Sequence, residues 1–183
     1  MRLTRGSTGV VLSYPPVTLV SVTAWSLGGK VIAMTTVADV AAYILGRSGA
    51  MTAMKLQKLC YHALGYHMAW EGRKLFNEHF EAWANGPVSP TLYRQHRGRF
   101  TLNVGDISGN PDALDAGERE SVDIILANMG NMSAHELSAY THTQPPWLLA
   151  RQRAQVGDLD RSSEALLDDE IAEFFEALVD SAE

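Results

Sequence analysis

The residue types best suited to metal binding or nucleophilic catalysis in this sequence are six histidines and one cysteine. Cys60, His62 and His67 fall within one predicted helix, but spacings of two and five residues place them on different faces. Two helical ligands of one ion are normally three or four residues apart. His135 and His142 are seven residues apart and lack a carboxylate at a complementary spacing. We therefore expect no metal site and no cofactor, with Cys60 as a small core residue.

The common catalytic and nucleotide-binding motifs are missing from the sequence. Gly28-Gly29-Lys30 lacks both the earlier glycine and the following Ser or Thr of a phosphate-binding loop. No Gly-x-Ser-x-Gly, His-Glu-x-x-His or Gly-x-Gly-x-x-Gly pattern occurs. We therefore expect a protein that is not an enzyme, and an unrecognised hydrolase or metal enzyme is the weaker alternative.

The charged residues are unevenly distributed along the chain. The net charge is −6, from 15 Lys and Arg and 21 Asp and Glu residues. Residues 1–33 have three basic residues and no acidic ones (+3), residues 34–154 have eleven of each (0), and residues 155–183 have ten acidic residues opposed only by Arg161 (−9). This balance provides no broad positive field for phosphate groups, so nucleic-acid binding is disfavoured. The acidic segment predicts either a solvated helix face or a region that docks onto a basic protein.

Basic side chains in the middle of the chain suggest a second way to bind a protein. They form either a patch that contacts an acidic partner or a set of solvated helix faces, and the sequence leaves both interpretations open. The residues concerned are Lys55, Lys58, Arg73, Lys74, Arg94, Arg97 and Arg99.

Length and composition predict one globular domain. With 183 residues, of which 46% are hydrophobic and 20% charged, the chain can bury one core without disulfides or metals. The lone cysteine favours a reducing cytoplasm. We expect residues 1–33 to be a loosely attached leader or translated upstream sequence, because Tyr14-Pro15-Pro16 interrupts the apolar run that a secretory signal or a membrane span needs. Regular patterning begins at Met34, so residues 34–183 are expected to form a single domain with an acidic C-terminal helix.

The apolar periodicity and the capping residues predict a mainly α protein. Helices are expected over residues 36–46, 52–72, 89–96, 115–130 and 133–140, with a last amphipathic helix around residues 171–178. Pro145-Pro146 is expected to form a turn that carries Trp147. Residues 80–84 and 99–104 alternate in hydrophobicity and are expected to pair with each other as a small antiparallel β-ribbon. The predicted fold is a compact multi-helix domain with this ribbon, at the border of the α+β class.

Three strings of the sequence resemble, in this order, the signature of the Panacea domain, the SocA-like antitoxin family that includes phage-associated GepA-type proteins. The first resembles the family's Lys-Leu-Gln-Lys-Leu helix, the second its Ala-Trp…Gly-Pro-Val segment, and the third its Leu-Ser…Thr-His…Pro-Trp segment. The strings are Lys55–His67, Glu81–Tyr93, and Glu136–His142 followed by Pro146-Trp147. The resemblance extends over about residues 35–178, and residues 1–33 lie outside it.

This resemblance implies a cytoplasmic antitoxin of a type II toxin–antitoxin system. Such a protein neutralises a cognate toxin, encoded in the adjacent gene, by binding it directly. We expect no membrane partner, and the charge balance disfavours a nucleic-acid partner. A founding member of the family also presents its toxin to the ClpXP protease. The alternative is therefore a proteolytic adaptor that delivers a client toxin to a ClpXP-type protease.

The resemblance and the residue types together suggest which side chains contact the partner. The candidates are Lys55, Lys58, Tyr61, Trp83 and Arg94, and the motifs are expected to share a groove with Trp83 in or beneath its floor. Because lysines are rarely buried, reversing the charge of Lys58 is expected to weaken partner binding with little effect on stability, whereas removing the Trp83 ring should damage both. Structural roles are expected for the other motif residues, which are Gly86, Pro87, Val88, His142 and Trp147.

Overall fold

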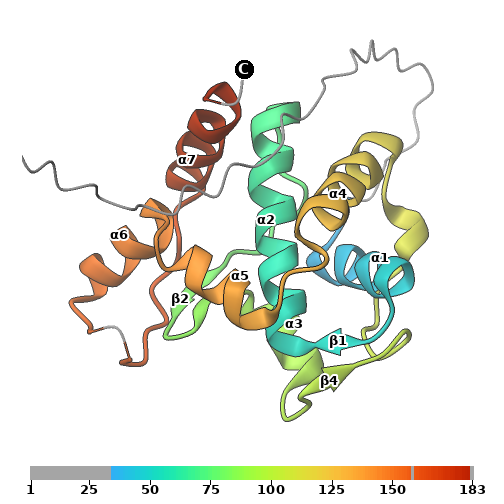
Figure 1. The fold of residues 1–183 in the computed structure, drawn as a ribbon, viewed down its shortest axis with the longest axis horizontal. Coiled ribbons are helices and arrows are strands. Elements are labelled where there is room, and N and C mark those ends of the chain that lie inside the picture. The colour runs from blue at the N-terminus through green and yellow to red at the C-terminus, as the bar shows by residue number, and fades with distance from the viewer. Residues whose placement is uncertain (1–33, 158, 182–183) are drawn as a thin grey trace, which may run out of the picture.

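The computed structural model describes residues 34–157 and 159–181, which form seven α-helices, one 3-10 turn and four short strands (Figure 1). In chain order these are α1 (Val37–Ser48), β1 (Met51–Thr52), α2 (Ala53–Glu71), β2 (Glu81–Trp83), β3 (Gly86–Val88), α3 (Pro90–His96), β4 (Thr101–Leu102), η1 (Pro111–Ala113), α4 (Ala116–Met129), α5 (Ala134–Thr141), α6 (Pro145–Ala154) and α7 (Asp168–Asp180). The predicted mainly α fold with small antiparallel β elements is confirmed. The predictions for residues 1–33 lie outside the described residues.

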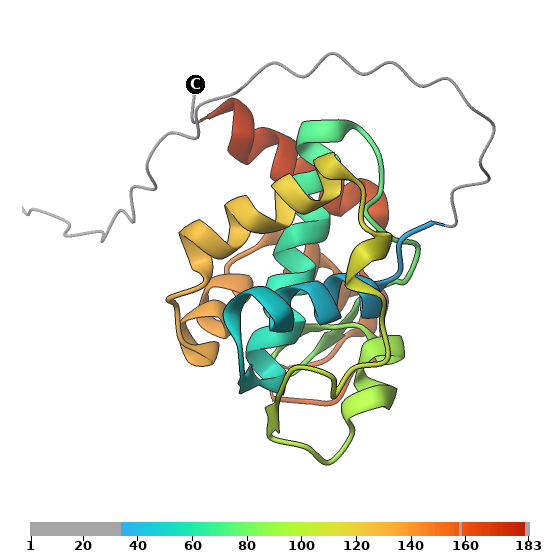
Figure 2. The same cartoon turned by 90° about the vertical axis from the view of Figure 1, so that its right-hand side faces the viewer.

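The longest helix of the described residues, α2, lies at the centre of the fold. It begins after Thr52, whose hydroxyl accepts a hydrogen bond from the Lys55 N–H (3.2 Å), and it ends where Gly72 adopts the left-handed conformation (φ 63°). Helices α1, α4, α5 and α7 all pack against it, and Figures 1 and 2 show it passing through the middle of the molecule. Neither α2 nor any other helix in the part of the chain described is long and apolar enough to cross a membrane.

The packing of α7 against α2 depends on Gly65. A Cβ atom at this position would overlap the Phe175 ring, so glycine is needed for the two helices to approach this closely. Phe175 also makes edge-on contacts with the rings of Tyr61 and Tyr66, at centroid distances of 5.7 and 4.8 Å. The C-terminal helix is therefore part of the core on the face that carries Phe175 and the buried Ile171.

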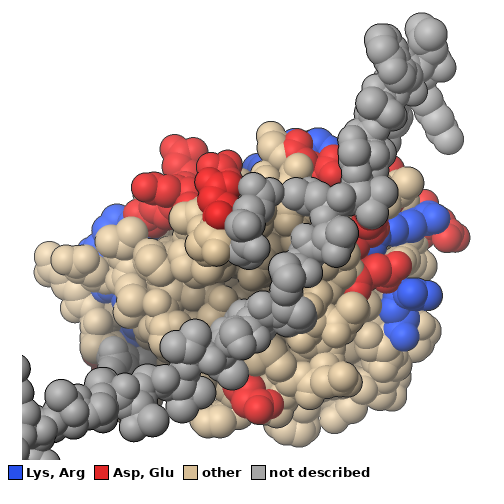
Figure 3. All heavy atoms as spheres, turned by 45° about the horizontal axis from the view of Figure 1, so that its top comes forward, with Lys and Arg blue, Asp and Glu red and all other residues tan. Residues whose placement is uncertain are grey.

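The acidic residues of the C-terminal region are partly neutralised within the chain. Lys74 pairs with Asp168 (2.7 Å), and Arg153 pairs with Glu164 (3.2 Å) and with Glu170. These pairs are exposed or partly exposed, so each contributes only about 0–1 kcal/mol. Figure 3 shows acidic side chains gathered over α7.

Three of the predicted helix starts are confirmed as capping boxes. In each, the side chain of the N-cap residue accepts a hydrogen bond from the N–H three residues later, and the carboxylate at that position accepts one from the N-cap N–H. The pairs are Thr36 with Asp39 in α1, Asp115 with Glu118 in α4, and Ser133 with Glu136 in α5.

The predicted strand pairing is wrong, although both predicted segments contain strands. Residues 80–84 supply β2, which pairs with β3 as a hairpin, and residues 99–104 supply β4, which pairs with β1. The reason is local, because Ala84 and Asn85 form a two-residue turn and Gly86 follows them with a φ of 92°. The chain therefore reverses at once and pairs with its own continuation, which costs less loop-closure entropy than a distant strand would.

Pro145 and Pro146 do not form the predicted turn but begin α6. The fixed φ of proline suits the first turn of a helix, and its missing N–H is no loss there because the first N–H groups have no partner within the helix. The helix places Trp147 and Arg151 four residues apart, on one face, and both side chains are buried.

Candidate functional site

The three motif strings meet at the β2–β3 hairpin. Helix α2 carries the first string, the hairpin belongs to the second, and α5 with the start of α6 carries the third. Gly86 lies where they meet, because a Cβ atom there would clash with Thr141 Oγ1 and would lie 2.9 Å from Lys58 Cε. Its φ of 92° is a second reason for glycine at this position.

Two residues of α6 hold strand β2. Trp147 Nε1 donates a hydrogen bond to the Trp83 carbonyl (2.9 Å), and Arg151 Nη1 donates one to the Ala82 carbonyl (2.8 Å). The Arg151 guanidinium lies over the Trp147 ring, 5.1 Å from its centroid, and the His142 ring stacks on the same indole at 4.2 Å. Trp147 is only 2% exposed, so its ring supports the hairpin and offers no contact surface.

Residues of α5 and α2 hold the turn and strand β3. Ser138 Oγ donates to the Asn85 carbonyl (2.9 Å), and Lys58 Nζ donates to the Pro87 carbonyl (2.9 Å). Gln57 bonds both backbone groups of Ser89, the residue that follows β3. It accepts from the Ser89 N–H at 2.9 Å and donates to the Ser89 carbonyl. These side chains give the hairpin backbone partners that a two-stranded pairing alone does not supply, and they fix its position.

Residues 164–166 lie along the outer edge of β2, beside the hairpin. Backbone hydrogen bonds of 2.8 Å join residues 164–166 to Phe80 and Ala82. The loop that precedes this segment is fixed in turn, because Arg151 Nη2 donates to two of its carbonyl oxygens, those of Gly157 and Asp160. Arg151 therefore connects α6, β2 and the loop.

A groove of about 740 Å³ runs beside the hairpin. Its walls come from α2, the hairpin, α3 with the loop that follows it, and residues 161–163. The rings of Trp83 and Tyr93 meet edge to face at 4.8 Å on one wall, and both side chains are partly exposed. Trp83 Nε1 donates to Glu81 Oε2 (2.7 Å), which holds the indole in place.

The groove has excess positive charge. It is lined by four basic residues, Lys58, Arg97, Arg99 and Arg161, and by one acidic residue, Glu81. Arg99 is paired with Asp106 (2.9 Å). Over residues 34–157 and 159–181, neither Arg97 nor Arg161 has a carboxylate partner. An anionic group that enters the groove therefore meets guanidinium groups that are not already neutralised.

Lys58 does not have the predicted exposure. Its side chain is 0% exposed, and the loss of hydration lowers its pKa to about 7. Within the described residues its hydrogen-bond acceptor is the Pro87 carbonyl, and no carboxylate pairs with it. The expectation that its charge can be reversed at little cost to stability assumed an exposed side chain, and the structure removes that basis. The hairpin covers this side of α2, so the lysine reaches a backbone carbonyl instead of solvent.

The two histidines of α2 are buried and neutral. Burial, with a smaller contribution from Lys58, lowers the pKa of His62 to about 3, and burial lowers that of His67 to about 4. His62 stacks on Tyr140 at 5.4 Å, and His67 Nδ1 shares a 2.9 Å hydrogen bond with a serine of α4. Burial raises the pKa of the Cys60 thiol, which is a core residue as expected. No group of three His, Cys, Asp or Glu among the described residues could hold a metal ion.

The remaining predicted contact residues lie away from the groove. Lys55 Nζ donates to the Gly130 carbonyl at the C-terminal end of α4 (2.6 Å). Tyr61 is fully buried, with its ring against Phe80 at 5.4 Å. Arg94 is exposed but does not line the groove. Of the five candidates, only the other two, Lys58 and Trp83, come together there, and the motif residue Val88 lines the groove with them.

Sequence reasoning missed Arg151 as a support of the hairpin and Arg161 as a groove residue. A signal for Arg151 existed, because it follows Trp147 by four residues and shares its face once Pro145 is taken as a helix start. Arg161 had no comparable signal, since its position depends on a loop that Arg151 holds through carbonyl groups.

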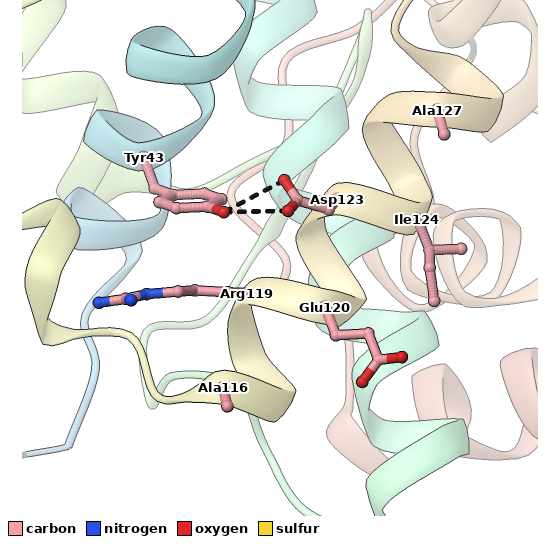
Figure 4. A pocket seen from close by; sticks show the side chains of 7 residues that line it. All are labelled: Tyr43, Ala116, Arg119, Glu120, Asp123, Ile124 and Ala127. Carbon is pink, nitrogen blue, oxygen red and sulfur yellow. Dashed lines mark hydrogen bonds between the residues drawn. The ribbon is translucent and has the colours of Figure 1, made fainter. Parts of the chain in front are cut away.

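A second hollow, of about 600 Å³, lies between α1 and α4 (Figure 4). Tyr43 points from α1 toward Asp123 on α4, and its hydroxyl lies 3.1 and 3.2 Å from the two carboxylate oxygens. Asp123 also pairs with Arg47 (3.1 Å), while Glu120 and Ile124 point away from Tyr43. Because its central polar groups are paired with one another, this hollow is the weaker candidate.

Comparison with known proteins finds a family match that includes most of the residues lining the groove. The family model described as "Antitoxin SocA-like, Panacea domain" matches residues 56–148, which include the hairpin, α3 and α5. Antitoxin SocA of Caulobacter vibrioides (strain NA1000 / CB15N) is 34% identical over 106 residues, which cover 51% of this chain and 56% of that protein, so the chain spans about half the length of this curated relative. No solved structure matches the chain significantly. On the extent of the family match, this chain belongs to the SocA-like Panacea domain family.

Proposed function

We propose that this protein is an antitoxin of a type II toxin–antitoxin system, acting in the cytoplasm and neutralising a protein toxin from the adjacent gene by direct binding. The observation that carries the proposal is that the family-matched residues 56–148 build the hairpin and most of the groove beside it. The antitoxin name of the curated relative supports the same function.

The way the hairpin is held favours neutralisation by binding. Side chains from α2, α5 and α6 fix its backbone through Lys58, Ser138, Trp147 and Arg151. A surface that is already ordered loses little conformational entropy when a partner binds, so more of the contact energy is realised as affinity. No catalytic step is required, and neutralisation should be stoichiometric.

Co-expression tests this function. The adjacent reading frame is expressed alone and together with this protein, and we expect the first to arrest growth and the second to restore it. The purified pair should co-elute at a fixed ratio, and neutralisation in a titration should be complete near equimolar amounts. A neighbour that does not arrest growth, or arrest that this protein does not relieve, would contradict the proposal. Neutralisation by a small fraction of an equivalent would indicate an enzyme.

The same experiment in cells without ClpX or ClpP separates direct neutralisation from delivery to a protease. Direct binding predicts equal rescue in both strains and a constant toxin half-life. Rescue that disappears with the protease, together with a longer toxin half-life, would establish the proteolytic adaptor instead.

A further inference from the structure

Two arginines at the groove are available to bind a group from outside the chain. Arg97 is exposed directly after α3, and Arg161 is exposed on the segment that leads to the outer edge of the hairpin. In the described part of the chain neither side chain donates a hydrogen bond or pairs with a carboxylate, whereas those of Arg73, Arg99 and Arg153 do both. A guanidinium group binds carboxylates well because its paired N–H donors match the two carboxylate oxygens.

The same groove presents fixed aromatic surface. The partly exposed rings of Trp83 and Tyr93 contact each other at 4.8 Å, and the indole N–H is already bonded to Glu81. Because the hairpin backbone is held by α2, α5 and α6, the Trp83 ring is ordered before any partner arrives. Preordered aromatic rings next to arginines are the side chains that most often dominate the energy of a protein interface.

Lys58 places a buried amine under the groove. Its side chain lines the groove from α2, and its ammonium has a carbonyl, not a carboxylate, as its acceptor among the described residues. Burial disfavours the charged form of this group, and a carboxylate entering the groove would favour it again. The arginines at the rim therefore match negative charge, and the amine beneath the floor gains a proton more readily when a carboxylate enters.

From this geometry we propose that the groove binds an acidic peptide segment of the toxin, with carboxylates against Arg97 and Arg161 and an apolar side chain against Trp83 and Tyr93. The inference rests on the proposed antitoxin function. No other part of this chain suits the site as well. Residues 1–33 contain three basic residues and no acidic ones, and much of the C-terminal acidity lies on α7, which is packed against α2.

A nucleic acid is the other anionic polymer that a basic groove attracts. Binding to a phosphate backbone draws its affinity from the number of phosphates that Lys and Arg side chains neutralise. This groove offers Arg97 and Arg161 at its rim, and the net charge of −6 opposes long-range attraction of a polyanion. A short protein segment with few carboxylates therefore fits the groove better.

The first test measures the affinity of purified wild-type and variant protein for the toxin by isothermal titration calorimetry. Arg97→Glu and Arg161→Glu should each weaken binding about tenfold or more. Arg94→Glu is the matched control, because it makes the same charge change three residues from Arg97, on an exposed side chain outside the groove. It should change the affinity less than about twofold, and all four proteins should unfold within about 2 °C of one another.

The outcomes separate the two proposals. If the wild type binds the toxin but the Arg97 and Arg161 variants bind as tightly as the Arg94 variant, the groove inference is wrong and the antitoxin function stands. If the wild type does not bind the product of the adjacent gene, the antitoxin function itself is contradicted.

A second test needs no toxin. A short fluorescein-labelled peptide in which Glu alternates with Leu is titrated with the protein and followed by fluorescence anisotropy, beside its Gln counterpart and a single-stranded DNA oligonucleotide of equal charge. Saturable binding of the Glu peptide is expected, about tenfold weaker in the Arg97→Glu/Arg161→Glu double variant and unchanged in Arg94→Glu. Absence of saturable binding, equal binding of the Gln peptide, or DNA binding as tight as that of the Glu peptide would overturn the proposal.

Discussion

The two sides of the β2–β3 hairpin have opposite character. On the buried side, polar side chains from α2, α5 and α6 donate hydrogen bonds to hairpin carbonyls, as Arg151 does and as Lys58 does from beneath the groove. On the groove side, Trp83 is partly exposed and two arginines, Arg97 and Arg161, have no carboxylate partner in the described residues. The residues of the first side come mostly from the three motif strings or their immediate neighbours, and both arginines lie outside those strings.

The three strings therefore supply the residues that hold the hairpin and the aromatic wall of the groove, whereas the two arginines that attract an anion lie outside them. A change on the buried side should therefore act first on the free energy of unfolding. A change on the groove side should act first on partner affinity. Substitutions on the two sides should separate these two effects.

The largest effect is expected from Trp147→Ala. The substitution removes a buried ring and its hydrogen bond to the Trp83 carbonyl, so the free energy of unfolding should fall by about 3–5 kcal/mol. Urea unfolding followed by circular dichroism measures it. Trp83→Ala is the comparison. Because the Trp83 ring is partly exposed, the free energy of unfolding of this variant should fall by only about 1–2 kcal/mol, while its affinity for the toxin should fall strongly. Equal losses of stability would show that the two sides are not distinct.

Lys58→Met should change how stability depends on pH. The pKa of Lys58 is lowered from 10.5 to about 7 in the folded protein, so between pH 7 and 10.5 the unfolded chain binds a proton that the folded chain does not. Wild-type stability therefore gains on the order of 1.4 kcal/mol per pH unit from this residue as the pH rises through that window, and the variant lacks this gain.

The measurement is the difference in the free energy of unfolding between wild type and Lys58→Met at several pH values, which cancels other titrating groups. Lys58→Glu, which places a buried carboxylate beside a carbonyl, should fold poorly throughout. A difference that stays constant from pH 7 to 10.5 would contradict the burial of a titrating amine.

His62→Phe should make the protein more resistant to acid. The pKa of His62 is lowered from 6.5 to about 3 in the folded protein. Below pH 6.5 the unfolded chain therefore binds a proton that the folded chain does not bind, so stability falls as the pH falls. Phenylalanine has a similar shape and keeps the stacking on Tyr140. Between pH 7 and pH 5, the free energy of unfolding of the variant should therefore fall by about 1–2 kcal/mol less than that of the wild type. Thermal unfolding at the two pH values measures this.

The smallest effect is expected from Lys55→Gln. It removes the hydrogen bond to the Gly130 carbonyl, so stability should fall by about 0.5–1.5 kcal/mol, and toxin affinity should stay the same because Lys55 does not line the groove. Loss of affinity without loss of stability would indicate that the partner contacts the side of α2 that faces α4.

The elements that the sequence predicted well are those set by short-range chemistry. The capping boxes at Thr36, Asp115 and Ser133 involve residues three apart, so their patterns are visible without the fold. Strand pairing was not predictable in the same way, because residues 80–84 and 99–104 have matching alternation and only the turn before Gly86 decides the partner.

The candidate site was predicted in part for a related reason. Trp83 and Lys58 were expected at one groove, and both line it. The burial of Lys58 was missed because it depends on α2, the hairpin and α5 coming together, and side-chain type alone predicts an exposed lysine. The place of Arg161 depends on carbonyl groups, which have no signature in sequence.

Two parts of the fold, the segment beside β2 and the last helix, lie beyond the residues that the family model matches. The match ends at residue 148, yet residues 164–166 complete the sheet beside β2 and Phe175 fills the space above Gly65. A protein engineer who grafts only the matched region into another chain would leave an open strand edge, which invites aggregation. Exchange of the Arg161 loop between relatives, by contrast, would replace one groove wall and leave the hairpin in place. If the groove binds the partner as proposed, exchange of this loop should change partner choice without changing the domain that carries it.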